Sequence, residues 1–396
     1  MSDFISEEQH HAEVAALNHE IYRLTKHIKD KEQERALSEM PDPKDPFNNP
    51  TEYHDYNDDY SEVLPPIKTP AYKISLEPDY AERQKIKHFY AIGGWCAVLQ
   101  FAASTFAAVV IVLIIRTLLE GQNPDADNVS ITTYMKGSSI LTSLNMLIYI
   151  AANVGCAMIG FKMAGVKASS LVKTRDYDVG KAIQYCTAAM FIWLVSVYIS
   201  LGVEDIFTKY GYSTEVQDME GYAVTKLGFV ISIVYTCIIA PVTEEFFFRG
   251  MLLKVFSKAN QRFAVFATAV FFGLAHGNLP QFLLAFLLGI FLAHITLKHG
   301  SIIPSIVVHI FVNTFVTVMG ELDLSGDMEL VLNLSLEALA AFGLLMLLIF
   351  RSKDKLPATT PAQSKRGFAI AKTTVGVVAA FTIQTAYVLF LVFSKA

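Results

Sequence analysis

The chain has 396 residues, of which 53% are apolar and only 17% are charged, and its net charge is −5. A soluble domain carries about 25% charged residues, so this composition excludes an ordinary soluble protein and indicates a membrane protein. The sequence contains no basic patch of the kind that binds nucleic acid, so nucleic acid is not an expected partner. The total charge is unevenly spread, because residues 1–88 carry −8 and residues 89–396 carry +3.

Residues 1–88 form a polar, acidic tail. Apolar residues between Val14 and Ile28 recur at intervals of three and four, which predicts an amphipathic helix or a short coiled coil over residues 6–36. Residues 41–70 hold seven prolines among Asn, Asp and Tyr residues and are expected to be a disordered, extended linker without a core. No signal peptide occurs in the first 40 residues, so the first membrane helix is expected to act as the insertion signal.

Residues 89–396 contain repeated apolar runs of the length that a helix needs to cross a bilayer, about 20 residues. These runs predict an all-α membrane domain, a polytopic bundle of eight or nine transmembrane helices. The fifth and sixth candidates are short enough to be tilted or partly re-entrant. The nine candidates cover residues 89–116, 140–163, 182–203, 226–248, 262–277, 281–297, 301–320, 330–350 and 368–393.

The charges of the connecting loops alternate along the chain. Basic residues lie before the first candidate span and in every second connection after it, whereas the other connections are almost free of basic residues and often acidic, as in "EGQNPDADN". Because basic loops stay in the cytoplasm, this alternation predicts an integral membrane protein with a cytoplasmic N-terminus. With nine spans, the C-terminus is then expected outside the cell.

The stretch "APVTEEFFFRG" places Glu244, Glu245 and Arg249 at the end of an apolar run. Each of these charges costs roughly 2.5–3.5 kcal/mol at a bilayer centre, so charged groups within spans are functional candidates. Glu245 and Arg249 are four residues apart and are expected to form a structural ion pair on one helix face. Glu244 is turned about 100° away, and we expect it to have a working role inside the bundle.

Two later spans carry similar pairs. "FFGLAHG" contains Phe272 and His276, and "SIVVHIFVN" contains His309 and Asn313, each four residues apart on one helix face. The helical rise of about 1.5 Å per residue places these pairs and Glu244 at broadly similar depth in the membrane. The remaining ionisable groups of the spans stand alone or near span ends and are expected to be structural: His294, His299 and Glu337. The cysteines lack paired spacing and are expected to pack as small apolar residues: Cys96, Cys156, Cys186 and Cys237.

The ordered set Glu-Glu-x-x-x-Arg, Phe-x-x-x-His and His-x-x-x-Asn on successive membrane helices resembles the CPBP intramembrane proteases. That family includes the type II CAAX prenyl endopeptidases and the bacterial Abi-type proteins. The resemblance covers a catalytic core at about residues 225–320 and does not extend to the tail or the outer spans. It implies an endopeptidase, in a bacterial plasma membrane, that cleaves near the C-terminus of a membrane-associated protein or peptide with or without a lipid group.

The resemblance also implies roles for the motif residues, and two mechanisms stay open. In the first, Glu244 with His276 beside it activates a water molecule, while His309 and Asn313 donate hydrogen bonds to the oxyanion. In the second, Glu244, His276 and His309 hold one zinc ion that activates the water. The expected cofactor is therefore none or one divalent metal, and Asn313, a neutral donor, favours the metal-free form. The residues expected to support the site are Glu245, Arg249 and Phe272.

The alternative is a non-catalytic polytopic membrane protein, either a proton-coupled transporter or a bacteriocin-immunity or scaffold protein. Transporters also bury Glu and His residues, but they typically show repeats with broken helices in matching halves. Here the motifs cluster in one part of the chain, so the sequence favours the protease.

Overall fold

The computed structural model describes residues 14–26, 78–120, 139–174, 176–211, 226–322, 325–353 and 367–393. Within these ranges the regular structure is helical and no strand occurs, which confirms the predicted all-α bundle. The long helices are α3 (Pro78–Glu120), α5 (Ser139–Ala164), α6 (Val179–Lys209), α10 (Gln261–Leu274), α11 (Leu279–His299), α12 (Ile303–Gly320), α13 (Asp327–Lys353) and α15 (Val375–Phe393). The fourth span is composite and consists of α7 (Lys226–Val234), η2 (Tyr235–Ile239), α8 (Ala240–Glu245), η3 (Phe246–Leu252) and α9 (Leu253–Ser257).

The chain divides into two compact units, Met1–Lys44 and Asp45–Ala396. In the first unit, residues 14–26 form a helix with exposed side chains, and this helix lies inside the range predicted for the tail. The predicted linker over residues 41–70 lies outside the described residues.

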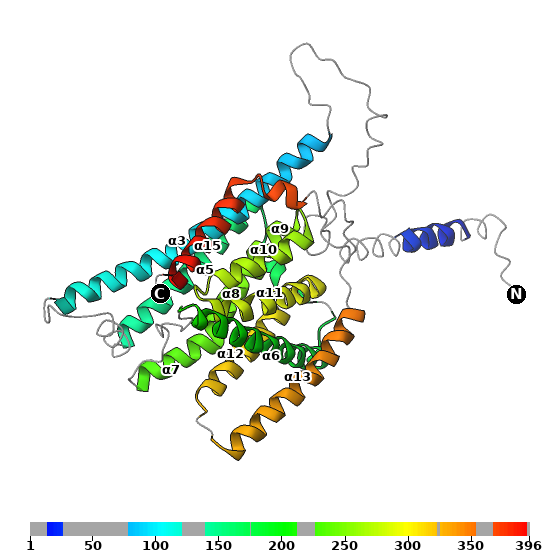
Figure 1. The fold of residues 1–396 in the computed structure, drawn as a ribbon. Helices are drawn as coiled ribbons and strands as arrows, with labels where there is room; N and C mark the ends of the chain where they lie inside the picture. Colours follow the sequence, from blue (N-terminus) through cyan, green and yellow to red (C-terminus); the bar gives the residue numbers. More distant parts are fainter. Residues whose placement is uncertain are drawn as a thin grey trace, which may run out of the picture. The chain divides into compact units, whose positions relative to one another are not determined.

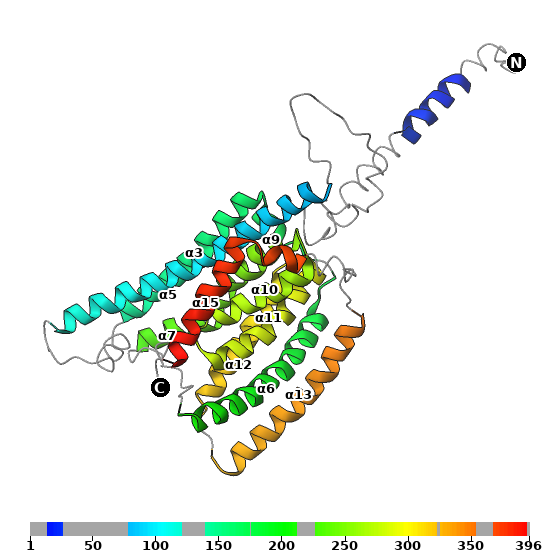
Figure 2. The same cartoon turned by 45° about the horizontal axis from the view of Figure 1, so that its top comes forward.

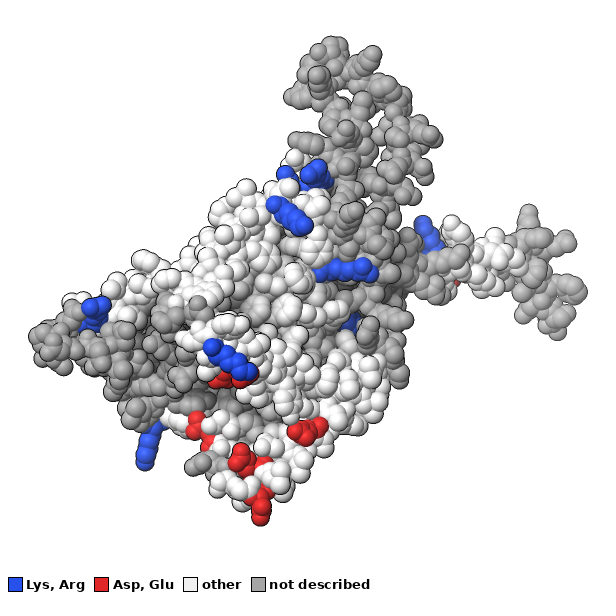
Figure 3. Space-filling model, in the orientation of Figure 1, with Lys and Arg blue, Asp and Glu red and all other residues white. Residues whose placement is uncertain are grey.

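Among the described residues, eight helices are long and apolar enough to cross a membrane. Their outer faces carry large apolar side chains that are exposed in the isolated chain, such as Phe106, Leu144, Phe342 and Phe390. Charged side chains are sparse on the surface shown in Figure 3. Such a surface is stable only where hydrocarbon rather than water surrounds it, so the protein is an integral membrane protein.

The first and last predicted spans differ most clearly from the helices. Helix α3 begins at Pro78, so residue 88 lies inside a continuous helix rather than at the edge of the tail. The last candidate, 368–393, is divided into a helical turn at residues 367–371 and helix α15. The hydroxyls of Thr373 and Thr374 both donate to the carbonyl of Ile370, which offers the backbone an alternative to helix continuation.

The fifth candidate corresponds to α10, which has 14 residues. At about 1.5 Å per residue it is about 21 Å long, shorter than the roughly 30 Å hydrocarbon core. The sixth candidate, α11, has 21 residues and is long enough to span. Helices α10 and α11 pack side by side as a hairpin (Figures 1 and 2).

The helices of the membrane domain pack in neighbouring groups (Figures 1 and 2). Helix α3 packs against α5 and α15, and α6 packs against α11, α12 and α13. Between these groups lie the composite fourth span and α10. The buried apolar side chains form one large cluster around the fourth span, α3 and α10, and a second one around α6, α11 and α12. Motif residues occur in both regions: Phe272 belongs to the first cluster, and Val308 and Val312, on either side of His309, belong to the second.

Candidate active site

The fourth span carries the doubled carboxylate in a short α-helical segment between two π-helical segments. Helix α8 has six residues and ends at Glu245, with the π-helix η2 before it and the π-helix η3 after it. A π-helical turn contains an extra residue, so it shifts the side chains that follow and frees backbone carbonyls. One such carbonyl, that of Thr236 in η2, accepts a hydrogen bond from Asn313 Nδ2 at 3.0 Å. This contact joins the third motif to the fourth span.

Glu245 and Arg249 form the predicted ion pair. Arg249 Nη1 donates to Glu245 Oε1 at 2.7 Å, and both side chains are fully buried. The guanidinium carbon of Arg249 also lies 4.2 Å from the centroid of the Phe272 ring, where the ring face attracts a cation. Glycine at position 289 of α11 leaves room for this arrangement, because a Cβ there would lie 3.3 Å from Arg249 Nη2 and 3.1 Å from Ala269 Cα.

Glu244 differs from its neighbour in exposure. Its side chain is 24% exposed, whereas that of Glu245 is 0% exposed. Glu244 Oε2 lies 3.7 Å from His309 Nε2. The expectation that Arg249 neutralises one carboxylate of the pair on the same helix face therefore agrees with the geometry.

His309 of α12 lies between the two carboxylates. Its Nδ1 is 3.0 Å from Glu245 Oε1, and its Nε2 faces Glu244. The carboxylate of Glu245 is ion-paired and can only accept, so Nδ1 must carry the hydrogen. The neutral ring then has a lone pair at Nε2. His309 can therefore donate from Nε2 only as the doubly protonated imidazolium.

Phe272 connects the motifs in space. Its ring is buried, and the rings of His276 and His309 contact it edge-on with centroid distances of 5.1 and 5.5 Å. The same ring lies under Arg249. Residues from the fourth span, α10 and α12 thus meet around one aromatic side chain, as their similar predicted depth implied.

His276 lies in the tight turn between α10 and α11. Gly277, with φ of 70°, provides the left-handed conformation that ends α10, and Asn278 caps α11 by accepting from the backbone N–H of Gln281. His276 Nδ1 lies 2.8 Å from the carbonyl oxygen of Phe272. Because a carbonyl can only accept, Nδ1 carries the hydrogen and Nε2 of the neutral ring is an acceptor.

The sequence analysis missed a chain of buried polar residues that ends beside the site. Gln100 Nε2 of α3 donates to Asn153 Oδ1 of α5 at 3.0 Å, and Asn153 Nδ2 donates to Thr243 Oγ1 at 3.4 Å. Thr243 directly precedes Glu244. The sequence did contain an indication of this chain, namely two amide side chains inside apolar spans. An unpaired amide is costly in hydrocarbon, so each of them needs a hydrogen-bond partner.

The other ionisable groups singled out in the spans lie elsewhere. His294 bonds to the carbonyl of Ile290, His299 bonds to the Tyr185 hydroxyl, and Glu337 accepts from the Tyr198 hydroxyl. The four cysteines are free thiols. Within the described part of the chain, no group of three or more His, Cys, Asp and Glu side chains is arranged to hold a metal ion. Glu244, His276 and His309 as placed therefore do not form a ligand set, and we derive no step through a metal.

Comparisons with known proteins relate this part of the chain to a family of membrane endopeptidases. Residues 226–315 match the model of the family described as type II CAAX prenyl endopeptidase Rce1-like. The chain is also 24% identical over 227 residues, which are 57% of this chain and 88% of the relative, to a protein of Bacillus subtilis (strain 168) named "Putative membrane peptidase YdiL". No solved structure matches the chain at a significant level.

Proposed function

We propose that Glu244 is the general base of an intramembrane endopeptidase. Its substrate would be a membrane-associated protein or peptide, cut near its C-terminus. The proposal is supported by the match of residues 226–315 to the family described as type II CAAX prenyl endopeptidase Rce1-like. The observation that carries the proposal is the contrast between the adjacent carboxylates: Glu245 is enclosed and paired, whereas Glu244 is accessible beside His309. A purely structural network would not require the second carboxylate.

In the proposed reaction, the Glu244 carboxylate takes a proton from a water molecule, and the resulting hydroxide attacks the carbonyl carbon of the scissile peptide bond. His276 supports this step, because its Nε2 lone pair can accept a hydrogen bond from the other O–H of the water and so orient the molecule. The C–N bond of the tetrahedral intermediate then breaks as Glu244 returns its proton to the leaving nitrogen. The products are an amine and a carboxylic acid, which carries the other hydrogen of the water until it ionises, and no further reactant is needed.

The negative charge that develops on the carbonyl oxygen needs hydrogen-bond donors. The imidazolium form of His309 provides an N–H at Nε2, on the side that faces Glu244. Asn313 Nδ2 uses one hydrogen for the Thr236 carbonyl and has a second hydrogen for the substrate. Glu245, Arg249 and Phe272 would hold these two donors and the base in place.

The experiment compares three purified full-length proteins on a library of peptides, with cleavage positions read by mass spectrometry. The wild type and Glu337→Gln, a change in a membrane carboxylate bonded to Tyr198, should cleave the same peptides near their C-termini. Glu244→Gln keeps the size of the side chain but cannot take a proton, so it should not cleave. Cleavage by Glu244→Gln would disprove the base assignment, and no cleavage by any of the three would disprove the protease.

A further inference from the structure

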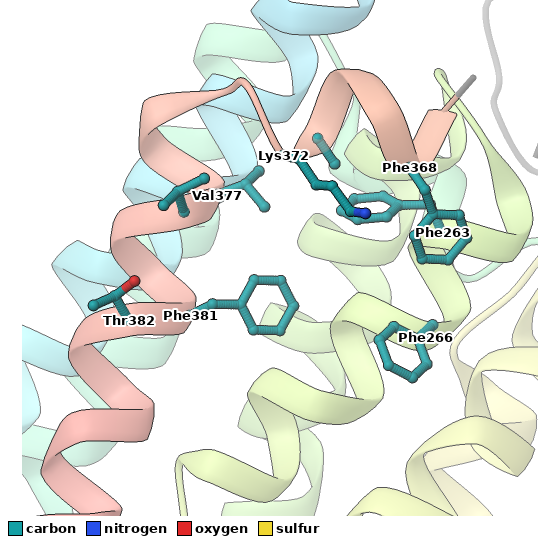
Figure 4. A pocket seen from close by; sticks show the side chains of 9 residues that line it. Phe263, Phe266, Phe368, Lys372, Val377, Phe381 and Thr382 are labelled. Carbon is teal, nitrogen blue, oxygen red and sulfur yellow. The ribbon is translucent and has the colours of Figure 1, made fainter. Parts of the chain in front are cut away.

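A pocket of about 220 Å³ lies between α10 and α15, where the last span is divided (Figure 4). The lining residues that matter here are Phe263, Phe266, Phe368, Lys372, Val378 and Phe381. Pockets that enclose a whole drug-sized molecule measure about 300–1,000 Å³. This smaller pocket therefore suits one segment of an elongated apolar ligand.

The pocket follows from the break before α15. The helical turn at residues 367–371 ends shortly before Thr373 and Thr374, and its Phe368 packs edge-on against Phe263 with a centroid distance of 5.4 Å. Farther along, Phe381 packs against Phe271 at 4.3 Å, which holds the two helices together below the opening. Phe266 and Val378 are 44% and 43% exposed, so the pocket opens on the outer surface of the bundle, where lipid surrounds the protein.

One end of the pocket is cationic. Lys372 is exposed, and Figure 4 shows its side chain extending across the end of the pocket toward the side of Phe263 and Phe368. Arg262 is exposed one helical turn before Phe266. The two sides of the pocket, α10 and the segment around α15, belong to parts of the chain that contain no Asp or Glu, residues 250–320 and 355–396. These basic groups therefore have no carboxylate on their own segments to neutralise them.

We infer that this pocket binds an anionic phospholipid, with part of an acyl chain between α10 and α15 and the phosphate beside Lys372 and Arg262. The apolar lining gives no reason for a free anion to bind, and a zwitterionic lipid would bring no net charge to the basic end. The predicted orientation places the start of α10 on the cytoplasmic side, whose leaflet is the anionic one. The inference concerns lipid binding and does not depend on hydrolysis.

The test measures how much lipid stays bound to the purified full-length protein. Protein in detergent is mixed with equal amounts of phosphatidylglycerol and phosphatidylcholine that have identical acyl chains, and bound lipid is counted by native mass spectrometry. The wild type should retain phosphatidylglycerol in preference to phosphatidylcholine. Lys372→Gln should reduce that preference about fivefold, which corresponds to about 1 kcal/mol for one basic residue.

Two further variants separate a site from general attraction. Val378→Trp should fill the pocket and reduce phosphatidylglycerol retention although every charge is kept. Lys226→Gln removes an exposed lysine at the start of α7, away from the pocket, and should behave as the wild type. The inference would be overturned if the wild type retained the two lipids equally, or if neither pocket variant retained less phosphatidylglycerol than the wild type. It would also be overturned if Lys226→Gln lost as much phosphatidylglycerol as the pocket variants.

Discussion

The same substitution at two adjacent positions should affect different properties: Glu245→Gln should lower stability, and Glu244→Gln should lower activity. Glu245 is the carboxylate that neutralises Arg249, and both side chains are fully buried. Removing one partner of a buried pair leaves an uncompensated charge and costs about 3–5 kcal/mol. Glu244 is 24% exposed and lies 3.7 Å from His309, a contact of the partly solvated kind that contributes at most about 1 kcal/mol.

We therefore expect Glu245→Gln to lower the melting temperature by on the order of 10 °C, since each kcal/mol corresponds to about 2–4 °C in a domain of 150–250 residues. Glu244→Gln should melt close to the wild type and lose about 10²–10⁴ in turnover, the usual contribution of a general base. Thermal unfolding in detergent and hydrolysis of a cleavable peptide measure the two effects. A stable Glu245→Gln protein together with an unstable, active Glu244→Gln protein would refute the assignment of the two carboxylates.

Three other outcomes are expected. Replacing His309 or Asn313 by Ala should each lower the turnover number by about 10²–10³ as a lost oxyanion donor, with little change in KM; a change in KM alone would contradict that role. The purified enzyme should stay active after dialysis against a chelator, and about one zinc per chain, released in His276→Ala with loss of activity, would instead establish the metal mechanism. Cysteines introduced in residues 1–88 should be protected from a membrane-impermeant reagent applied to intact cells, and one at Ala396 should react; the reverse pattern would contradict the orientation inferred from the loop charges.

The orientation prediction depends on how many times the chain crosses the membrane. Helix α10 is too short to span as a straight helix, but α11, which packs along it, is long enough. The end of α11 lies near the end of the fourth span, because Ile302 bonds to Leu171 and the neighbouring Ser170 accepts from Lys254. The α10–α11 hairpin thus begins and ends on the same side of the membrane. Counting both of its helices as spans, or neither of them, therefore places the C-terminus on the same side.

The sequence by itself determined the features that depend on neighbouring residues. Apolar runs long enough for a bilayer specify the spans, and a spacing of four residues places Glu245 beside Arg249 and Phe272 beside His276 on one helix face. Both contacts are present. The family resemblance also came from the sequence alone, because the order of the three motifs along the chain can be read without the tertiary structure.

Only the tertiary structure decided how these local pairs meet. The contact between Glu245 and His309 joins residues 64 positions apart, and it sets which nitrogen of His309 carries hydrogen. The structure also contains π-helical segments before and after α8, which the spacing of apolar residues in "YTCII" and "FFFRGML" does not predict. Likewise, the acid-free segments around Arg262 and Lys372 are visible in the sequence, but the pocket between them exists only because α10 and α15 pack side by side.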